Sequence, residues 1–284
     1  MPGRAASPLQ VTRVVGLTFQ IIRHNRLRFI GLSAIVAPSA VLYSYLEAAD
    51  PNAYPWDLPL ALPLAAEIVA ATLLTATITR MIVPDGAGHY SSLAKSIRAV
   101  LNDVLALATI GLFSNVVILL NILAPFFILA DLGGPPTTDQ ISNFVIGLGI
   151  LALVLPGLVL TVLLAMLVPV RTIEQTNFVQ TFVRGAGLTK GNRWPIFGLV
   201  IATIVLEVVG NVAVYILVGI LAGDPVLALF SEQPPSNGAA AILGAALVAT
   251  AVSVVGATGT AVLYCELRRI NDGPAPRELA LEFD

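Results

Sequence analysis

Two carboxylic acids lie inside long apolar stretches of this sequence. They are Glu67 and Glu207, and neither has a basic residue close to it in its stretch. Asn211 and Tyr215 follow Glu207 at spacings of four and eight residues, so a helix would present all three on one face, and Asn115 occupies a similar depth in another stretch. A bare carboxylate in hydrocarbon is costly, so each Glu must be protonated or face water or polar protein groups.

This arrangement has two interpretations. In the first, Glu207, Asn211, Asn115 and Glu67 line a polar cavity within a helix bundle, which could hold a proton, a cation or a polar headgroup. In the second, a protonated Glu207 makes an interhelical hydrogen bond that contributes on the order of 1 kcal/mol. The sequence alone leaves both open.

Residue types that support catalysis are sparse elsewhere. The two histidines, His24 and His89, lie far apart, and Asp85 near His89 has no cysteine or carboxylate cluster to complete a metal site. The single Cys265 excludes an intrachain disulfide framework. No nucleophile elbow, phosphate-binding glycine loop or dinucleotide fingerprint occurs. We therefore expect no catalytic residue, no metal site and no cofactor, and a function that is not enzymatic.

The elements that must position these residues are membrane-spanning helices. The chain of 284 residues is 57% hydrophobic and 11% charged, with a mean hydropathy of +0.88. A helix crosses the hydrocarbon layer with about 20 apolar residues. Six stretches meet that length: 29–47, 60–83, 104–130, 144–170, 196–222 and 239–265. We therefore predict an all-α integral membrane protein with six transmembrane helices.

Charge predicts the orientation of these helices. All 15 Lys and Arg residues lie on one side of the six stretches, and the intervening segments 48–59, 131–143 and 223–238 contain acidic residues but no basic ones. Short basic loops remain on the cytoplasmic side of a membrane. The sequence therefore predicts a multi-pass protein of a bacterial inner (plasma) membrane with both termini in the cytoplasm.

Three amphipathic segments precede the odd-numbered stretches. They span residues 9–28, 91–103 and 176–194, and in each one apolar residues recur at helical spacing. The interpretation is a single membrane domain, 1–284, built of three repeats (about 9–83, 91–170 and 176–265) and a cytoplasmic tail, 266–284. Each repeat would contain an interfacial helix followed by a helical hairpin. The alternative is that these segments are cytoplasmic connections with incidental periodicity.

The basic residues of these segments are candidates for contact with anionic lipid headgroups, which attract Lys and Arg at the cytoplasmic surface. They form a predicted basic ring of Arg13, Arg23, Arg26, Arg98, Arg184, Lys190 and Arg193.

Short motifs in the third repeat carry a family resemblance. Pro169 is followed by Glu174, a basic helix then ends in Leu188–Thr189–Lys190–Gly191 before Trp194, and the last stretch closes with Leu263–Tyr264–Cys265–Glu266–Leu267–Arg268. Over residues 9–273 the chain resembles the six-span membrane domain of some bacterial glycerophosphodiester phosphodiesterases and related standalone membrane proteins of unassigned function. The resemblance implies a fold and a membrane setting. It implies no enzyme activity, because the catalytic barrel of those phosphodiesterases is absent.

Two functions follow as expectations. The first is a non-enzymatic scaffold or accessory protein of lipid or envelope homeostasis, whose partners are the phospholipid bilayer, anionic lipids and either another membrane protein or a second copy of the chain. The second is a small transporter or channel with an intramembrane polar site around Glu207. Nucleic acid is not an expected partner, because the net charge is −2.

Overall fold

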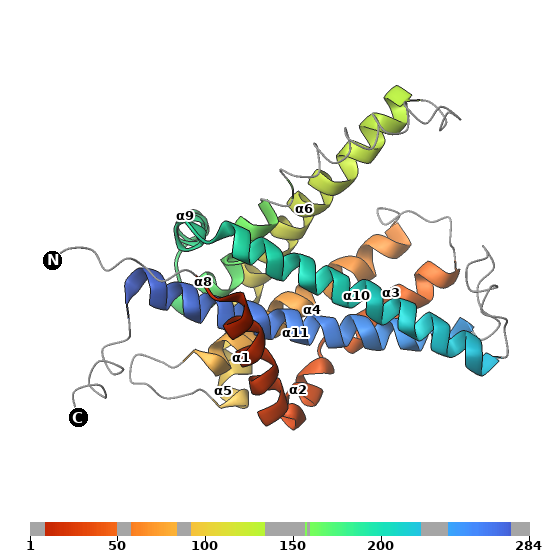
Figure 1. The fold of residues 1–284 in the computed structure, drawn as a ribbon, viewed down its shortest axis with the longest axis horizontal. Coiled ribbons are helices and arrows are strands. Elements are labelled where there is room, and N and C mark those ends of the chain that lie inside the picture. Colours follow the sequence, from red (N-terminus) through yellow and green to blue (C-terminus); the bar gives the residue numbers. More distant parts are fainter. Residues whose placement is uncertain are drawn as a thin grey trace.

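The chain folds into a helical bundle, seen in a computed structural model that describes residues 9–49, 58–83, 92–133, 157, 160–222 and 238–273 (Figure 1). Every regular element in those ranges is a helix. The helices are α1 (Val11–His24), α2 (Arg26–Ser33), α3 (Ala37–Ala49), α4 (Leu58–Ile82), α5 (Leu93–Asn102), α6 (Val104–Gly133), α8 (Leu167–Glu174), α9 (Phe178–Thr189), α10 (Arg193–Ala222) and α11 (Gly238–Asp272).

Between three and five candidate membrane spans occur among the described residues, judged by length and composition. Three single helices are long and apolar enough to cross a membrane, over Ala61–Ile82, Arg193–Val218 and Ile242–Asp272. Two bent pairs pass the same test, Arg26–Ser33 with Ala37–Leu46 and Leu93–Asn102 with Val104–Ile118. The fourth predicted span, 144–170, falls largely outside the described residues, so the six predicted spans remain a prediction.

The first predicted span, 29–47, is not one continuous helix. α2 ends at Ser33 and α3 begins at Ala37, with a bend of 46° between them. Pro38 explains the break, because its ring would clash with the carbonyl of residue 34 in a continuous helix and it has no N–H to donate. In the first turn of α3 the missing N–H removes no hydrogen bond.

Pro169 follows an interruption in the helix that leads into α8. It lies in the first turn of α8, where a proline is tolerated. The interruption comes earlier, as a turn at Ala165 and Met166. A proline at position 169 cannot donate to the carbonyl of residue 165, so the helical hydrogen-bond ladder is interrupted at that point.

The three amphipathic segments form α1, α5 and α9, which lie toward one end of the long helices together with α8 (Figure 1). α5 meets α6 at 77°, so it runs across the direction of that helix. Ser92 caps α5 by accepting from the Lys95 N–H, and Asn177 forms a capping box with Gln180 at the start of α9. These caps define separate short helices.

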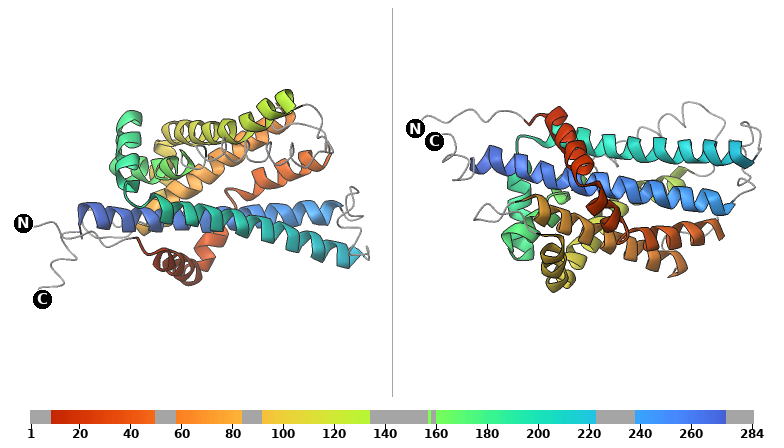
Figure 2. Two further views of the ribbon diagram at one scale, coloured as in Figure 1. Left: turned by 45° about the horizontal axis from the view of Figure 1, so that its top comes forward. Right: turned by 90° about the horizontal axis from the view of Figure 1, so that it is seen from below.

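α4 and α11 occupy the centre of the bundle. α11 packs against α10, α4, α3 and α1, and α4 also packs against α6, α5 and α8. α10 and α11 run side by side in both views of Figure 2. Their close approach uses glycine, because a Cβ at Gly210 would lie 2.8 Å from the Val248 Cγ1 and one at Gly244 would lie 2.3 Å from the Val214 Cγ1.

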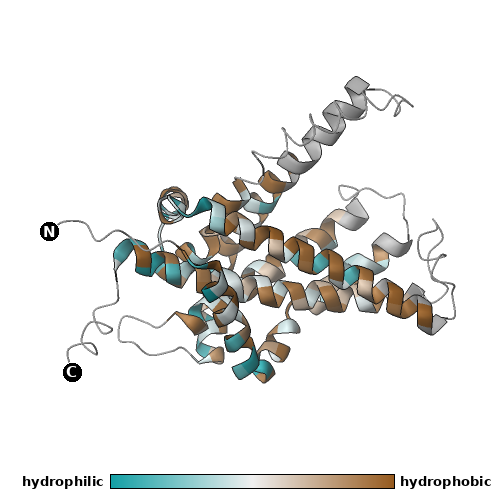
Figure 3. Cartoon of the chain, viewed as in Figure 1, coloured by the Kyte–Doolittle hydropathy of each residue, from teal (hydrophilic) through white to brown (hydrophobic). Residues whose placement is uncertain are grey.

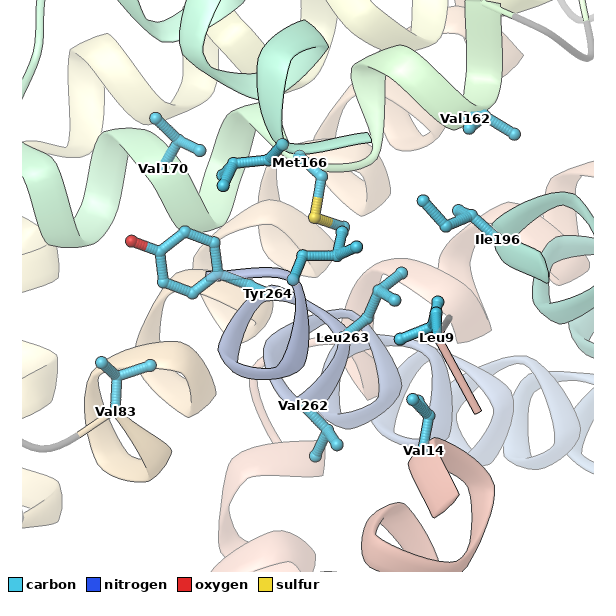
Figure 4. Packing of buried hydrophobic residues seen from close by; sticks show 12 residues of the cluster. Leu9, Val14, Val83, Val162, Met166, Val170, Ile196, Val262, Leu263 and Tyr264 are labelled. Carbon is cyan, nitrogen blue, oxygen red and sulfur yellow. The ribbon is translucent and has the colours of Figure 1, made fainter. Parts of the chain in front are cut away.

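One buried cluster joins the short helices to α11. Figure 4 shows it around Tyr264, which is fully buried in α11 near Val83, Met166 and Val170. A second cluster joins α2, α4 and α11 through Leu32, Leu74, Ile78 and Ala257, among others. These two clusters hold α4 and α11 in place beside the candidate site.

Candidate functional site

A cavity of about 570 Å³ lies among the long helices. Its walls come from α3, α4, α6, α10, α11, the segment 161–165 before α8, and Val168 in the first turn of α8. This volume falls in the range of small-molecule sites, about 300–1,000 Å³. The polar lining residues are Tyr43, Ser44, Glu67, Thr72, Thr75, Ser114, Asn115, Thr161, Glu207, Asn211, Ser253 and Thr260.

The cavity brings together the four residues that the sequence grouped as an intramembrane polar site. Glu67 lies on α4, Asn115 on α6, and Glu207 and Asn211 on α10, and all four line the cavity. Glu207 is exposed, so the cavity is not sealed on the α10 side. The side chain of Tyr215, expected on the same face as Glu207, lies outside the described residues.

Many polar hydrogens at the cavity are already engaged within single helices. Three of the four lining Thr hydroxyls donate their only hydrogen to their own helix: Thr72 to Ile68 O at 2.7 Å, Thr75 to Ala71 O at 2.8 Å and Thr161 to Gly157 O at 3.0 Å. Asn115 donates to Gly111 O at 2.9 Å, and Asn211 to Glu207 O at 3.0 Å. The carboxylate, amide and hydroxyl oxygens of the wall, which can accept hydrogen bonds, therefore outnumber the polar hydrogens that these bonds leave for a ligand.

Ser114 is the exception in this wall. Its side chain is only 7% exposed, and its Oγ is buried with no hydrogen-bond partner. A buried hydroxyl without a partner costs about 1–3 kcal/mol, so such groups in native proteins normally meet a protein group, a water or a ligand. Because Ser114 lines the cavity, a bound molecule there would satisfy it.

The contact between α4 and α6 shapes one wall. A Cβ added at Gly111 would lie 2.1 Å from the Thr72 Oγ1 and 2.9 Å from the Thr72 Cβ, and both residues line the cavity. Gly111 therefore permits a close approach of the two helices that no larger residue allows without a shift of Thr72.

A second polar group ties three helices together at the α8–α9 end. Arg184 of α9 donates through Nε to both oxygens of Glu174 in α8, at 3.1 and 3.2 Å, and through Nη2 to Asp272 at the end of α11. The Tyr264 hydroxyl of α11 donates to the Glu174 Oε1 at 3.1 Å. The hydrogen bonds to Asp272 and Glu174 raise the pKa of Arg184, so its guanidinium stays charged.

A related ion pair joins α8 to the α5–α6 turn. Arg171 donates to Asp103 through Nε at 3.0 Å and Nη2 at 2.7 Å, and through Nη1 to the carbonyl of Thr176. This bidentate geometry is the strong form of an Arg–carboxylate pair. Asp103 and Arg171 were not singled out as a pair, because their 68-residue separation leaves no periodic signal.

The residues of the predicted basic ring divide into two groups. Arg13 pairs with Glu266 at 3.3 Å, and Arg184 belongs to the Glu174 group. The other five are exposed, and among the described residues none forms an ion pair: Arg23, Arg26, Arg98, Lys190 and Arg193.

Sequence reasoning missed part of the cavity wall. Tyr43, Ser44 and Thr161 line it but stand as isolated polar residues in apolar stretches, with no spacing that marks a face. Within the described ranges no group of three or more His, Cys, Asp or Glu could hold a metal ion. His24 is exposed on α1, whereas Asp85 and His89 fall outside those ranges.

Comparison with known proteins gives one match. A domain of unknown function, DUF7847, matches residues 104–267, more than half of the 284-residue chain, and covers α6, α8, α9, α10 and most of α11. Nothing in this match links the chain to the membrane domain of glycerophosphodiester phosphodiesterases. No curated protein and no solved structure matches the chain. The protein therefore belongs to the DUF7847 family.

Proposed function

We propose that this protein is a non-enzymatic membrane protein that takes a small polar solute into the cavity between its long helices, as a small transporter or channel. The observation that carries the proposal is the 570 Å³ cavity, because two carboxyl groups and two amides from α4, α6 and α10 converge on it. Ionisable residues at membrane depth are rare, and they mark substrate and ion pathways in many membrane proteins.

We further propose six spans, three repeats and cytoplasmic termini in a bacterial inner membrane. The confinement of every Lys and Arg to one side of the apolar stretches supports this orientation. The position of α1, α5 and α9 toward one end of the bundle supports it as well (Figure 1).

Cysteine accessibility tests the proposal. Ser253→Cys, in a Cys265→Ser background, places a thiol in the cavity wall on α11. Hydrophilic methanethiosulfonate reagents attack only hydrated thiolates, so a cavity thiol should react at least about tenfold faster than one facing lipid. Val209→Cys is the matched control, because Val209 is 58% exposed on α10 and does not line the cavity.

The reagents are applied to proteoliposomes from one side and then from the other. A transporter or channel gives modification of Ser253→Cys from both sides. If Ser253→Cys reacts no faster than Val209→Cys from either side, no aqueous path reaches the cavity and the proposal is wrong.

A second candidate is the scaffold or accessory protein that contacts anionic lipid. Five exposed basic residues without ion pairs to described residues favour it, and so does the exposed apolar face of α9, formed by Phe178, Val179, Phe182 and Val183. A basic helix with such a face lies in the headgroup layer. The resemblance of the Pro169, Glu174 and Trp194 motif to the phosphodiesterase membrane domain points to the same setting. An unreactive Ser253→Cys would make this candidate the better one.

A further inference from the structure

We propose that the cavity binds an N–H-bearing ammonium group, carried either by a small organic amine or by an aminolipid headgroup. This inference rests on the proposed function and adds the chemical class of the solute. It follows from three properties of the wall, which are its charge, its hydrogen-bonding capacity and its unpartnered hydroxyl.

The two carboxyl groups give the wall of the cavity an acidic character. Glu67 and Glu207 bring carboxyl groups from α4 and α10, and among the described residues that line the cavity there is no Lys, Arg or His. Carboxylates removed from water need a countercharge or hydrogen-bond donors to offset desolvation. A cation in the cavity supplies that countercharge, whereas an anion would add to the repulsion.

The hydrogen-bonding groups of the wall favour a ligand that donates hydrogen bonds. The hydroxyl hydrogens of Thr72, Thr75 and Thr161 and one amide hydrogen each of Asn115 and Asn211 are held by backbone carbonyls of their own helices. Oxygen acceptors therefore predominate at the surface of the cavity. A primary ammonium offers three N–H donors and no acceptor, which matches such a wall, whereas a quaternary ammonium offers none.

The unpartnered Ser114 Oγ gives independent support. It is buried, lines the cavity, and can accept one of the ammonium hydrogens. The wall also contains apolar side chains, including Leu64, Ile68, Ile118, Leu164 and Val168. An alkyl portion beside the ammonium would contact these, so the volume of about 570 Å³ suits an organic amine better than a bare metal ion.

The test compares four probes in nanodiscs of phosphatidylglycerol, a lipid without an ammonium group. The probes are n-butylammonium, 1-butanol, butyrate and tetramethylammonium, and the measurement is the binding isotherm by calorimetry. We expect n-butylammonium to bind at least about tenfold more tightly than each of the other three, because only it combines positive charge with N–H donors.

Substitutions of the two cavity glutamates test whether n-butylammonium binds in the cavity. Glu67→Gln and Glu207→Gln should each weaken n-butylammonium binding by about tenfold or more, because each replaces a charge-assisted hydrogen bond by a neutral one. Glu266→Gln is the matched control, since Glu266 pairs with Arg13 and Arg269 and does not line the cavity, and it should leave the affinity unchanged.

The lipid composition of the nanodiscs distinguishes the two sources of the ammonium group, an aminolipid headgroup and a soluble amine. Nanodiscs that contain phosphatidylethanolamine should weaken n-butylammonium binding by competition if the headgroup is the ligand, and should leave it unchanged if the ligand is a soluble amine. The inference is wrong if 1-butanol, butyrate or tetramethylammonium binds as tightly as n-butylammonium, or if neither glutamate variant alters its binding. In that case, modification of Ser253→Cys from both sides would still support a solute path, so the two proposals fail separately.

Discussion

The carboxylate of Glu174 links three helices, α8, α9 and α11, at the α8–α9 end of the bundle. It accepts from Arg184 of α9 and from Tyr264 of α11, while Arg184 also reaches Asp272. Tyr264 is fully buried, and the Glu174 side chain is 19% exposed, so water screens these contacts only in part. The group therefore connects the buried cluster in Figure 4 to the charged surface.

We expect Glu174→Ala to destabilise the protein by about 1–2 kcal/mol, because it leaves the Tyr264 hydroxyl without its carboxylate partner and Arg184 with Asp272 alone. The measurement is thermal or denaturant unfolding in detergent, followed by tryptophan fluorescence. Arg268→Ala is the control, since Arg268 pairs with Asp272 only at 3.8 Å and is 46% exposed. A loss for Glu174→Ala no larger than that of Arg268→Ala would show that the group contributes little to stability.

At the scale of the element, the helix pair α4 and α6 sets the width of the cavity. Gly111→Ala should lower the stability by about 1–3 kcal/mol, because the added methyl group would lie within 2.1 Å of the Thr72 Oγ1 and rotation of Thr72 cannot relieve a contact of 2.9 Å to its Cβ. The shift in unfolding midpoint measures this effect.

Gly198→Ala is the matched control for the same exchange. Gly198 lies in α10 with nothing within 4 Å of an added Cβ, and alanine is the better helix former there by about 1 kcal/mol. The control should therefore be neutral or slightly stabilising. If Gly111→Ala behaves in the same way, α4 and α6 do not approach as closely as the structure places them.

Much of the helix arrangement could be predicted because apolar length and charge fix it locally. The predicted stretches 60–83, 196–222 and 239–265 correspond to α4, α10 and α11, and the amphipathic segments to α1, α5 and α9. The break before Pro38 was missed, since the apolar run continues through it. A single proline in an apolar stretch is compatible with a kink, a break or a helix start, and only packing decides between them.

The sequence predicted only those residues of the candidate site whose burial in an apolar stretch has a large cost in free energy. Glu67 and Glu207 were recognisable because a carboxyl group in an apolar stretch requires an explanation. Thr161 and Ser44 were not, because isolated hydroxyl residues are common in apolar helices and can bond to their own backbone. The Glu174 group depends on tertiary contacts over as many as 90 residues, which periodicity does not encode.

At the scale of the whole molecule, polarity is divided along the bundle. Figure 3 shows hydrophobic colours along α10 and much of α11, and hydrophilic colours at the C-terminal end of α11 and on α1 and α2. From residue 201 to 209, α10 is exposed at every position except Thr203, and all of these exposed residues are apolar except Glu207, which also lines the cavity. An exposed apolar helix in water would promote aggregation, whereas in a bilayer it faces lipid.

This division predicts the topology, with the three acidic connections outside and the basic segments inside. Ser236→Cys and Thr137→Cys, each in the Cys265→Ser background, should be labelled by an impermeant maleimide in intact cells stripped of any outer envelope, because short loops without Lys or Arg are translocated. Lys190→Cys, exposed after α9, should be labelled only after the membrane is opened.

Protection of Ser236→Cys or Thr137→Cys in intact cells would contradict the six-span topology. Labelling of Lys190→Cys before the membrane is opened would place the basic segments on the outside and reverse the orientation, because the positive charge then could not have held that end of the bundle in the cytoplasm.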